Sequence, residues 1–81
     1  MSSYCFSLSL DGAEQPTGSG EFTDSQSAVH HGRELLLSTV ARQRPATAYC
    51  VVYASETIGS EPLGVWDVSR EAPMPVWTPE E

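Results

Sequence analysis

The chain has 81 residues, the length of one domain, and its eleven acidic residues oppose four arginines and no lysine, for a net charge of −7. Contacts to phosphate need Lys and Arg, so this balance argues against direct nucleic-acid binding and favours a partner with a basic surface. No apolar run reaches the length of a membrane span, and Met1 is followed almost directly by an alternating segment, so we expect a cytoplasmic protein without a signal peptide.

The segment 4–10 alternates strictly between large apolar and small residues. One face carries Tyr4, Phe6, Leu8 and Leu10, and the other carries Cys5, Ser7 and Ser9. This period of two predicts a half-buried strand. Asp11 followed by Gly12 predicts a tight turn. The Gly-, Pro- and Ser-rich residues 13–20 predict a loop, with a short return strand near 20–22.

The segment 23–44 predicts the only long helix. Thr23 and Gln26 have the spacing of a capping box, and Asp24 is the alternative N-cap. Helical spacing joins Ala28, Val29, Gly32, Leu35, Leu36, Thr39 and Val40 into one apolar stripe, which Leu37 widens. Gly32 costs the helix about 1 kcal/mol relative to Ala. We therefore expect it to mark a close approach of the helix to a strand.

Basic residues and a proline predict the end of this helix. Arg42 and Arg44 complement the negative end of the helix dipole, and Pro45 stops the helix.

Two further strands follow the helix. In the segment 46–54, one face carries Cys50, Val52 and Ala54, and the other carries Tyr49, Val51 and Tyr53. Because both faces are apolar, this strand is expected to be central or covered on both sides. The acidic turn region 55–62 leads to a third strand over 63–68, which we expect to be antiparallel to the second.

The tail from residue 71 is rich in proline. Pro73, Pro75 and Pro79 favour polyproline II or irregular chain and are expected to exclude a ladder strand. Val76 and Trp77 indicate that the tail packs on something. We divide the chain into one domain, residues 1–70, and a Pro-rich acidic tail, residues 71–81. Either this tail or a second subunit is expected to cover the sheet's other face.

Catalytic and metal chemistry finds no support in the residue spacing. His30 and His31 are adjacent, so in a helix their side chains point about 100° apart and do not readily share one ion. Cys5 and Cys50 lie in strands with apolar neighbours, where burial is the usual outcome; whether they pair stays open. We predict no catalytic residue, no metal ligand and no cofactor, and we predict that the protein is not an enzyme.

Two features suggest binding. The first is an acidic set, Asp11, Glu14, Glu21, Glu56, Glu61 and Asp67. The second is an aromatic set, Tyr49, Tyr53, Trp66 and Trp77. The partner-binding residues that we predict are Glu56, Glu61, Asp67, Tyr49, Tyr53, Trp66 and Trp77. The alternatives are that the acids only keep the protein soluble and that the aromatics only build the core.

The first half of the chain resembles a family of short uncharacterised bacterial domains. The resemblance rests on Tyr4 and Phe6, Asp11 and Gly12, Gly20 and Glu21, Asp24, Ala28, and the run Arg33, Glu34, Leu35 and Leu36. It implies a β-β-α-β-β order and no activity. In size, acidity and element order the chain is also similar to small phage-encoded inhibitors, anti-CRISPR proteins among them.

These observations predict an α+β fold, an antiparallel sheet of three to four strands with one helix packed on one face. We expect a non-enzymatic inhibitor that occupies a basic, nucleic-acid-binding surface of a larger protein, as an anti-CRISPR protein would. The alternative is a bacterial housekeeping module that self-associates through its sheet as a homodimer.

Overall fold

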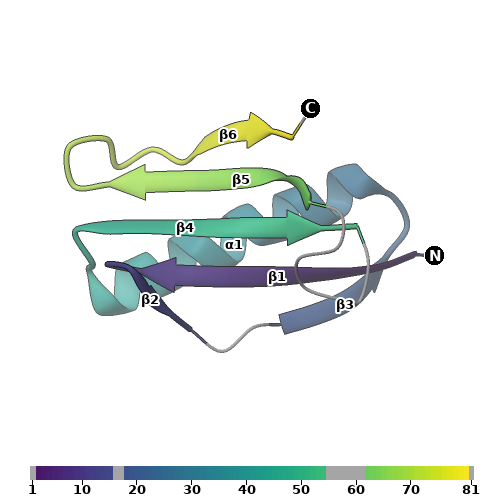
Figure 1. Cartoon of the computed structure of the whole chain (residues 1–81), viewed down its shortest axis with the longest axis horizontal. Helices are drawn as coiled ribbons and strands as arrows, with labels where there is room; N and C mark the ends of the chain where they lie inside the picture. The colour runs from purple at the N-terminus through teal and green to yellow at the C-terminus, as the bar shows by residue number, and fades with distance from the viewer. Residues whose placement is uncertain (1, 16–17, 55–61, 81) are drawn as a thin grey trace.

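The computed structural model describes residues 2–15, 18–54 and 62–80. Its elements are β1 (Ser2–Leu10), β2 (Ala13–Glu14), β3 (Gly18–Phe22), α1 (Ser25–Gln43), β4 (Thr47–Tyr53), β5 (Pro62–Ser69) and β6 (Val76–Pro79). The strands form one antiparallel sheet in the order β2-β1-β4-β5-β6, and β3 also pairs with β1. Figure 1 shows α1 behind this sheet. The predicted α+β class is confirmed, but the sheet has six strands in the described residues rather than three or four.

The turn after β1 is built by Asp11 and Gly12, as predicted. Their φ angles are 51° and 84°, and two successive positive values define the type I′ turn that favours an Asp-Gly pair. The carboxylate of Asp11 accepts the backbone N–H of Ala46 at 2.8 Å and that of Thr47 at 3.0 Å. The N–H of Asp11 donates to the Thr47 carbonyl at 2.8 Å. One of the predicted surface acids therefore fastens the hairpin to the start of β4.

The return from this turn is more ordered than a loop. β2 and β3 both pair with β1, so the chain runs back along one edge of that strand. The return strand predicted near 20–22 is confirmed and begins earlier, at Gly18. Its last residue, Phe22, meets Tyr4 and Phe6 edge-on, each with ring centroids 5.9 Å apart. These aromatic contacts hold β3 against β1 where its Gly and Ser residues offer little side-chain packing.

Helix α1 begins at the alternative N-cap. Asp24 has an extended backbone, and its carboxylate accepts the N–H of Ser27 at 2.8 Å. The backbone hydrogen bond from Ser27 lowers the pKa of Asp24. At the other end Arg44 takes the left-handed conformation and donates its N–H to the Val40 carbonyl at 2.8 Å. The helix thus ends before Pro45, as predicted.

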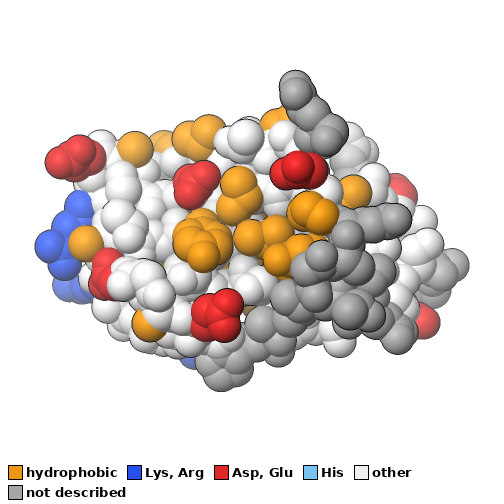
Figure 2. Space-filling model, viewed as in Figure 1, with side chains coloured by type: hydrophobic (Ala, Val, Ile, Leu, Met, Phe, Trp, Pro, Cys, Tyr) orange, Lys and Arg blue, Asp and Glu red, His pale blue; other side chains and the backbone are white. Residues whose placement is uncertain are grey.

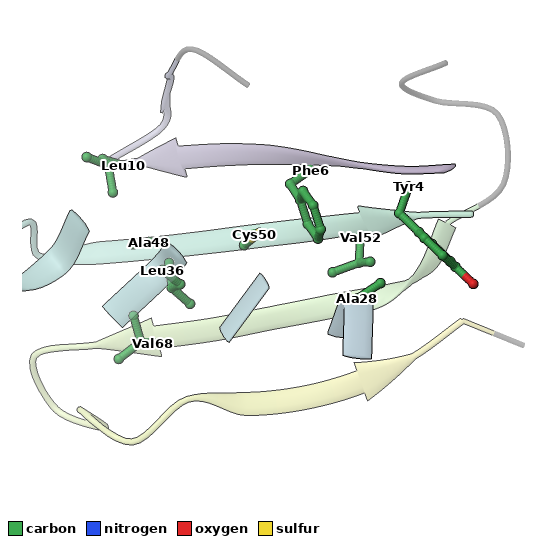
Figure 3. Packing of buried hydrophobic residues seen from close by; sticks show 9 residues of the cluster. All are labelled: Tyr4, Phe6, Leu10, Ala28, Leu36, Ala48, Cys50, Val52 and Val68. Atoms are coloured by element: carbon green, nitrogen blue, oxygen red, sulfur yellow. The ribbon is translucent and has the colours of Figure 1, made fainter. Parts of the chain in front are cut away.

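A narrow line of helix residues meets the sheet. The helix positions that are buried are Ala28, Gly32, Leu36 and Thr39. Figure 3 shows apolar side chains from β1, β4, β5 and α1 converging on this line. A Cβ on Gly32 would lie 2.8 Å from Cγ2 of Val52 and 3.5 Å from Cδ1 of Phe6. The close approach predicted at Gly32 is confirmed.

The proline-rich tail contains a ladder strand, so the expectation that its prolines exclude one is wrong. The Glu80 N–H donates to the Leu63 carbonyl at 2.9 Å. Because successive N–H groups alternate in direction, Pro75 and Pro79 occupy positions that point away from β5. Proline is tolerated there because no ladder donor is lost. β6 extends the sheet at its edge (Figure 1), so the tail does not cover the face away from α1.

Candidate binding face of the sheet

The face of the sheet away from α1, called the open face below, is arranged in rows by the strand register. The first row crosses five strands and consists of Glu14, Ser9, Tyr49, Asp67 and Val76. The second row consists of Ser7, Val51, Val65 and Thr78. In the third row Cys5 pairs with Tyr53. Residues on different strands, far apart in sequence, therefore present one continuous surface.

An apolar strip runs along the middle of the open face. It consists of Tyr49, Val51, Tyr53 and Val65. Tyr49 is 41% exposed, and Val76 at the end of its row is 56% exposed. Figure 2 shows hydrophobic side chains gathered at the centre of this face with acidic side chains around them. An apolar patch rimmed by polar groups is the usual form of a protein-binding surface.

Acidic side chains flank the apolar strip, and basic ones do not. Glu14 and Asp67 lie in the same row on either side of Tyr49, about 14 Å apart at about 4.8 Å per strand. Glu21 lies opposite Ser3, along the same edge of β1 as Glu14. No described strand contains an arginine. The open face therefore combines apolar contact area with an unbalanced negative charge.

Two titratable side chains on this face, Tyr53 and Cys5, have pKa values shifted toward their neutral forms. Burial is the main cause that raises the pKa of Tyr53, and Cys5, Tyr49 and Glu14 nearby add to it. Burial also raises the pKa of the Cys5 thiol, whose residue is only 2% exposed. An activated cysteine needs a lowered pKa, so the shift at Cys5 runs opposite to nucleophilic chemistry.

The two cysteines are free and lie on opposite faces of the sheet. Cys5 is in register with Tyr53 on the open face, whereas Cys50 points toward the helix, beside the position of Gly32. Burial raises the pKa of Cys50 to about 12.

The predicted partner-binding residues are divided by the structure. Tyr49, Tyr53 and Asp67 share the open face. Glu56 and Glu61 lie outside the described residues. The position that sequence reasoning missed is Val65, which completes the apolar strip opposite Val51.

The two tryptophans lie on the other face, beside the helix. The rings of Trp66 and Trp77 are 5.2 Å apart, and both are half-buried. Nε1 of Trp66 donates to the Val29 carbonyl at 2.8 Å. The hydrogen bond holds β5 against α1, and the ring contact holds β6 against β5. The tryptophans therefore do not lie on the same surface as the tyrosines.

The histidines have separate surroundings. His30 lies 3.6 Å from Glu34 on the exposed side of the helix. The His31 ring packs against Phe6 and Phe22, each with centroids 5.1 Å apart. Within the described ranges, no group of three His, Cys, Asp or Glu side chains is placed to hold a metal ion.

A comparison with protein families, curated proteins and solved structures finds no match for the chain. The resemblance of the first half to short bacterial domains therefore stays a prediction. Among the described residues, no helix combines the length and the apolar character needed to cross a membrane.

Proposed function

We propose that this protein is a non-enzymatic binding protein that uses the open face to occupy a basic surface of a larger protein. The observation that carries the proposal is the row in which Glu14 and Asp67 flank the exposed ring of Tyr49. The apolar strip supplies contact area for burial, and the acids supply attraction and orientation toward basic groups. With a net charge of −7, the whole chain adds to that steering.

The partner class that this charge pattern fits is a protein whose basic surface normally binds nucleic acid. Such a surface presents Lys and Arg at phosphate-binding positions. An acidic protein on that surface competes with the nucleic acid, which makes it an inhibitor of the kind that anti-CRISPR proteins exemplify. The acids at the open face would take the place of phosphates at the basic groups of the partner. The apolar strip would add contact area that simple anions do not offer.

Self-association through the sheet is the second candidate, because the open face carries an apolar strip in which Tyr49 is 41% exposed. In a two-fold symmetric stack of two such faces, the same acids, Glu14 and Asp67, would be brought together. No strand arginine is present to neutralise them. The repulsion disfavours a homodimer at neutral pH and low salt, so a different, basic partner is preferred.

The decisive experiment compares two double variants with equal changes in net charge. Glu14→Lys with Asp67→Lys alters the open face, whereas Glu34→Lys with Glu71→Lys alters residues on the helix and after β5. Proteins captured from cells of the source organism by the wild-type chain are purified, and their affinities are measured at low and high salt. We expect the open-face double variant to bind at least about tenfold more weakly and the control to bind within about twofold of wild type.

Four outcomes contradict the proposal. Equal losses in both double variants would show that net charge, and not the open face, controls binding. An affinity that does not change with salt would exclude steering by acids. A captured partner that still binds nucleic acid normally in the complex would exclude inhibition by occupancy. A sedimentation measurement showing a dimer at low salt would favour self-association instead.

A further inference from the structure

A second surface, separate from the open face, lies where α1 ends. A pocket of about 320 Å³ opens between the end of the helix, the end of β5 and the chain that follows it. Its apolar lining consists of Val40, Val68, Pro45 and Pro73. Its charged lining consists of Arg44 and Arg70. The volume lies at the lower end of the range of about 300–1,000 Å³ that is usual for small-molecule sites.

Backbone hydrogen bonds hold the two arginines on neighbouring chain segments. Arg44 is fixed as the left-handed C-cap by its N–H bond to the Val40 carbonyl at 2.8 Å. The N–H of Arg70 donates to the Ala46 carbonyl at 3.0 Å. Ala46 is only two residues after Arg44, so the two arginine side chains start from adjacent points at the mouth of one pocket.

The wall opposite the helix is fixed as well. The N–H of Ser69 donates to the Ala72 carbonyl at 3.1 Å, and the Ala72 N–H donates to Oγ of Ser69 at 3.1 Å. This closed turn sets the position of Pro73, the next residue. Val68, which is buried in the core, forms part of the floor. The pocket is therefore built from constrained backbone on three sides.

The charge at this pocket is not neutralised within the described residues. The ion pairs among the described residues join His30 and Arg33 to Glu34, on the helix and away from this pocket. Neither Arg44 nor Arg70 forms one with a described residue. Glu71 follows Arg70 directly and makes no such pair with it. Figure 2 shows arginine side chains gathered at the end of the molecule where β5 ends. In a chain with eleven acids, two unpaired arginines at one apolar pocket are available to an external anion.

We propose that this pocket binds a carboxylate carried on a small apolar body. The planar guanidinium fork matches a carboxylate with two parallel hydrogen bonds. The valine and proline lining would receive the aliphatic part of the ligand. A nucleotide fits less well, because the pocket lining contains no aromatic ring on which a base could stack. The same chemistry is offered by a free aliphatic acid and by a peptide C-terminus with an apolar last residue.

The test uses the full chain with hexanoate as the probe, at pH 7 and constant ionic strength, monitored by the methyl resonances of Val40 and Val68. Hexylamine and hexanol serve as matched ligands without the negative charge. We expect saturable shifts with hexanoate alone. Arg44→Gln and Arg70→Gln should each weaken binding about tenfold, the effect of losing one charge-assisted contact. Arg42→Gln is the matched control, because Arg42 lies in the last helical turn but does not line the pocket.

A second pair of probes separates the two sources of carboxylate. Acetyl-Ala-Leu with a free C-terminus and its C-terminal amide differ only in the charged group. Tighter binding of the free peptide than of hexanoate assigns the site to peptide C-termini, and the reverse order assigns it to small acids. Equal shifts from inorganic phosphate, equal shifts from hexylamine or hexanol, or an equal loss in Arg42→Gln would each overturn the proposal. Variants of Glu14 and Asp67 should leave hexanoate binding unchanged, so this site and the open face are tested independently.

Discussion

Gly32 of the helix lies against Val52 of β4 so closely that a Cβ on the glycine would be 2.8 Å from Cγ2 of the valine. This distance is shorter than any normal contact between two carbon atoms. The contact sits at the centre of the core, where β4 is flanked by β1 and β5. The separation between the helix and the sheet is therefore set by the absence of one side chain.

Gly32→Ala should destabilise the fold by about 1–2 kcal/mol, although alanine favours a helix by about 1 kcal/mol, because overpacking costs more than the helix gains. Urea unfolding measures the effect. Ser38→Ala, at an exposed position of the same helix, is the control and should be neutral or slightly stabilising. Combining Gly32→Ala with Val52→Ala removes the opposing methyl groups. The two changes should then be less costly together than the total of their separate effects. If the destabilising effects of the two substitutions simply added, the close contact between Gly32 and Val52 would be contradicted.

Asp11→Ala should cost about 2–3 kcal/mol, because two backbone N–H groups lose their acceptor and the positive φ of 51° disfavours alanine. Asp11→Asn keeps an acceptor oxygen and tolerates that backbone conformation, so its cost should stay below about 1 kcal/mol. Chemical denaturation of the two variants makes the comparison. If both substitutions were equally costly, the carboxylate charge and not the turn geometry would be responsible.

Gly64→Ala should displace β6 and destabilise the protein by at least about 2 kcal/mol. A Cβ at this position would lie 2.6 Å from the Thr78 carbonyl oxygen and 2.6 Å from a ring carbon of Trp77. Amide hydrogen exchange should show loss of protection at Thr78. Gly18→Ala is the control, since nothing lies within 4 Å of its Cβ position. Full protection of Thr78 in the Gly64 variant would show that β6 does not pack there.

Stability should fall at alkaline pH because of Cys50. Burial raises the pKa of its thiol from 9.0 to about 12. The unfolded chain therefore loses the proton first, so the neutral thiol's contribution is complete below pH 9 and is lost as the pH rises toward 12. The slope is about 1.4 kcal/mol per pH unit and the loss at most about 4 kcal/mol. Denaturant unfolding between pH 8 and pH 11 measures it.

Cys50→Ala provides the control for this pH dependence. This substitution removes the thiol, so the free energy of unfolding should fall less steeply with rising pH. The packing that it removes should lower stability by the same amount at every pH. A residual slope should remain, because burial also raises the pKa values of Cys5 and Tyr53 in the same direction. An unchanged slope in Cys50→Ala would assign the alkaline transition to those other groups.

Several features of the fold could be predicted because they depend on neighbours in the chain. Alternation assigned Cys50 and Val52 to one face and Tyr49 and Tyr53 to the other, as the register shows. The glycine in the middle of the helical stripe predicted its close contact with the sheet. Strand β6 could not be predicted from its proline content. That content does not say whether the prolines occupy positions whose N–H would point toward β5 or away from it.

The candidate binding face was only half predictable. Tyr49, Tyr53 and Asp67 were chosen from their residue types, and the open face does bring them together. The same reasoning selects Trp66 and Trp77, but they lie on the opposite face, where Trp66 bonds to the helix and Trp77 packs on Trp66. The alternation of side chains along a strand assigns its residues to two faces. Which of these faces the helix covers depends on how all the strands pack together.

The sequence by itself determined the helix and its end before Pro45, the turn at Asp11, and the alternation of each main strand, because local hydrogen bonding and side-chain period fix these features. It offered Thr23 and Asp24 as alternative N-caps, and the structure selects Asp24. Only the tertiary structure placed Glu14, Tyr49 and Asp67 in one row, and Arg44 beside Arg70. Those neighbours are set by strand register and by contacts between residues far apart along the chain, such as Ser9 with Tyr49 and Ala46 with Arg70, which no local pattern encodes.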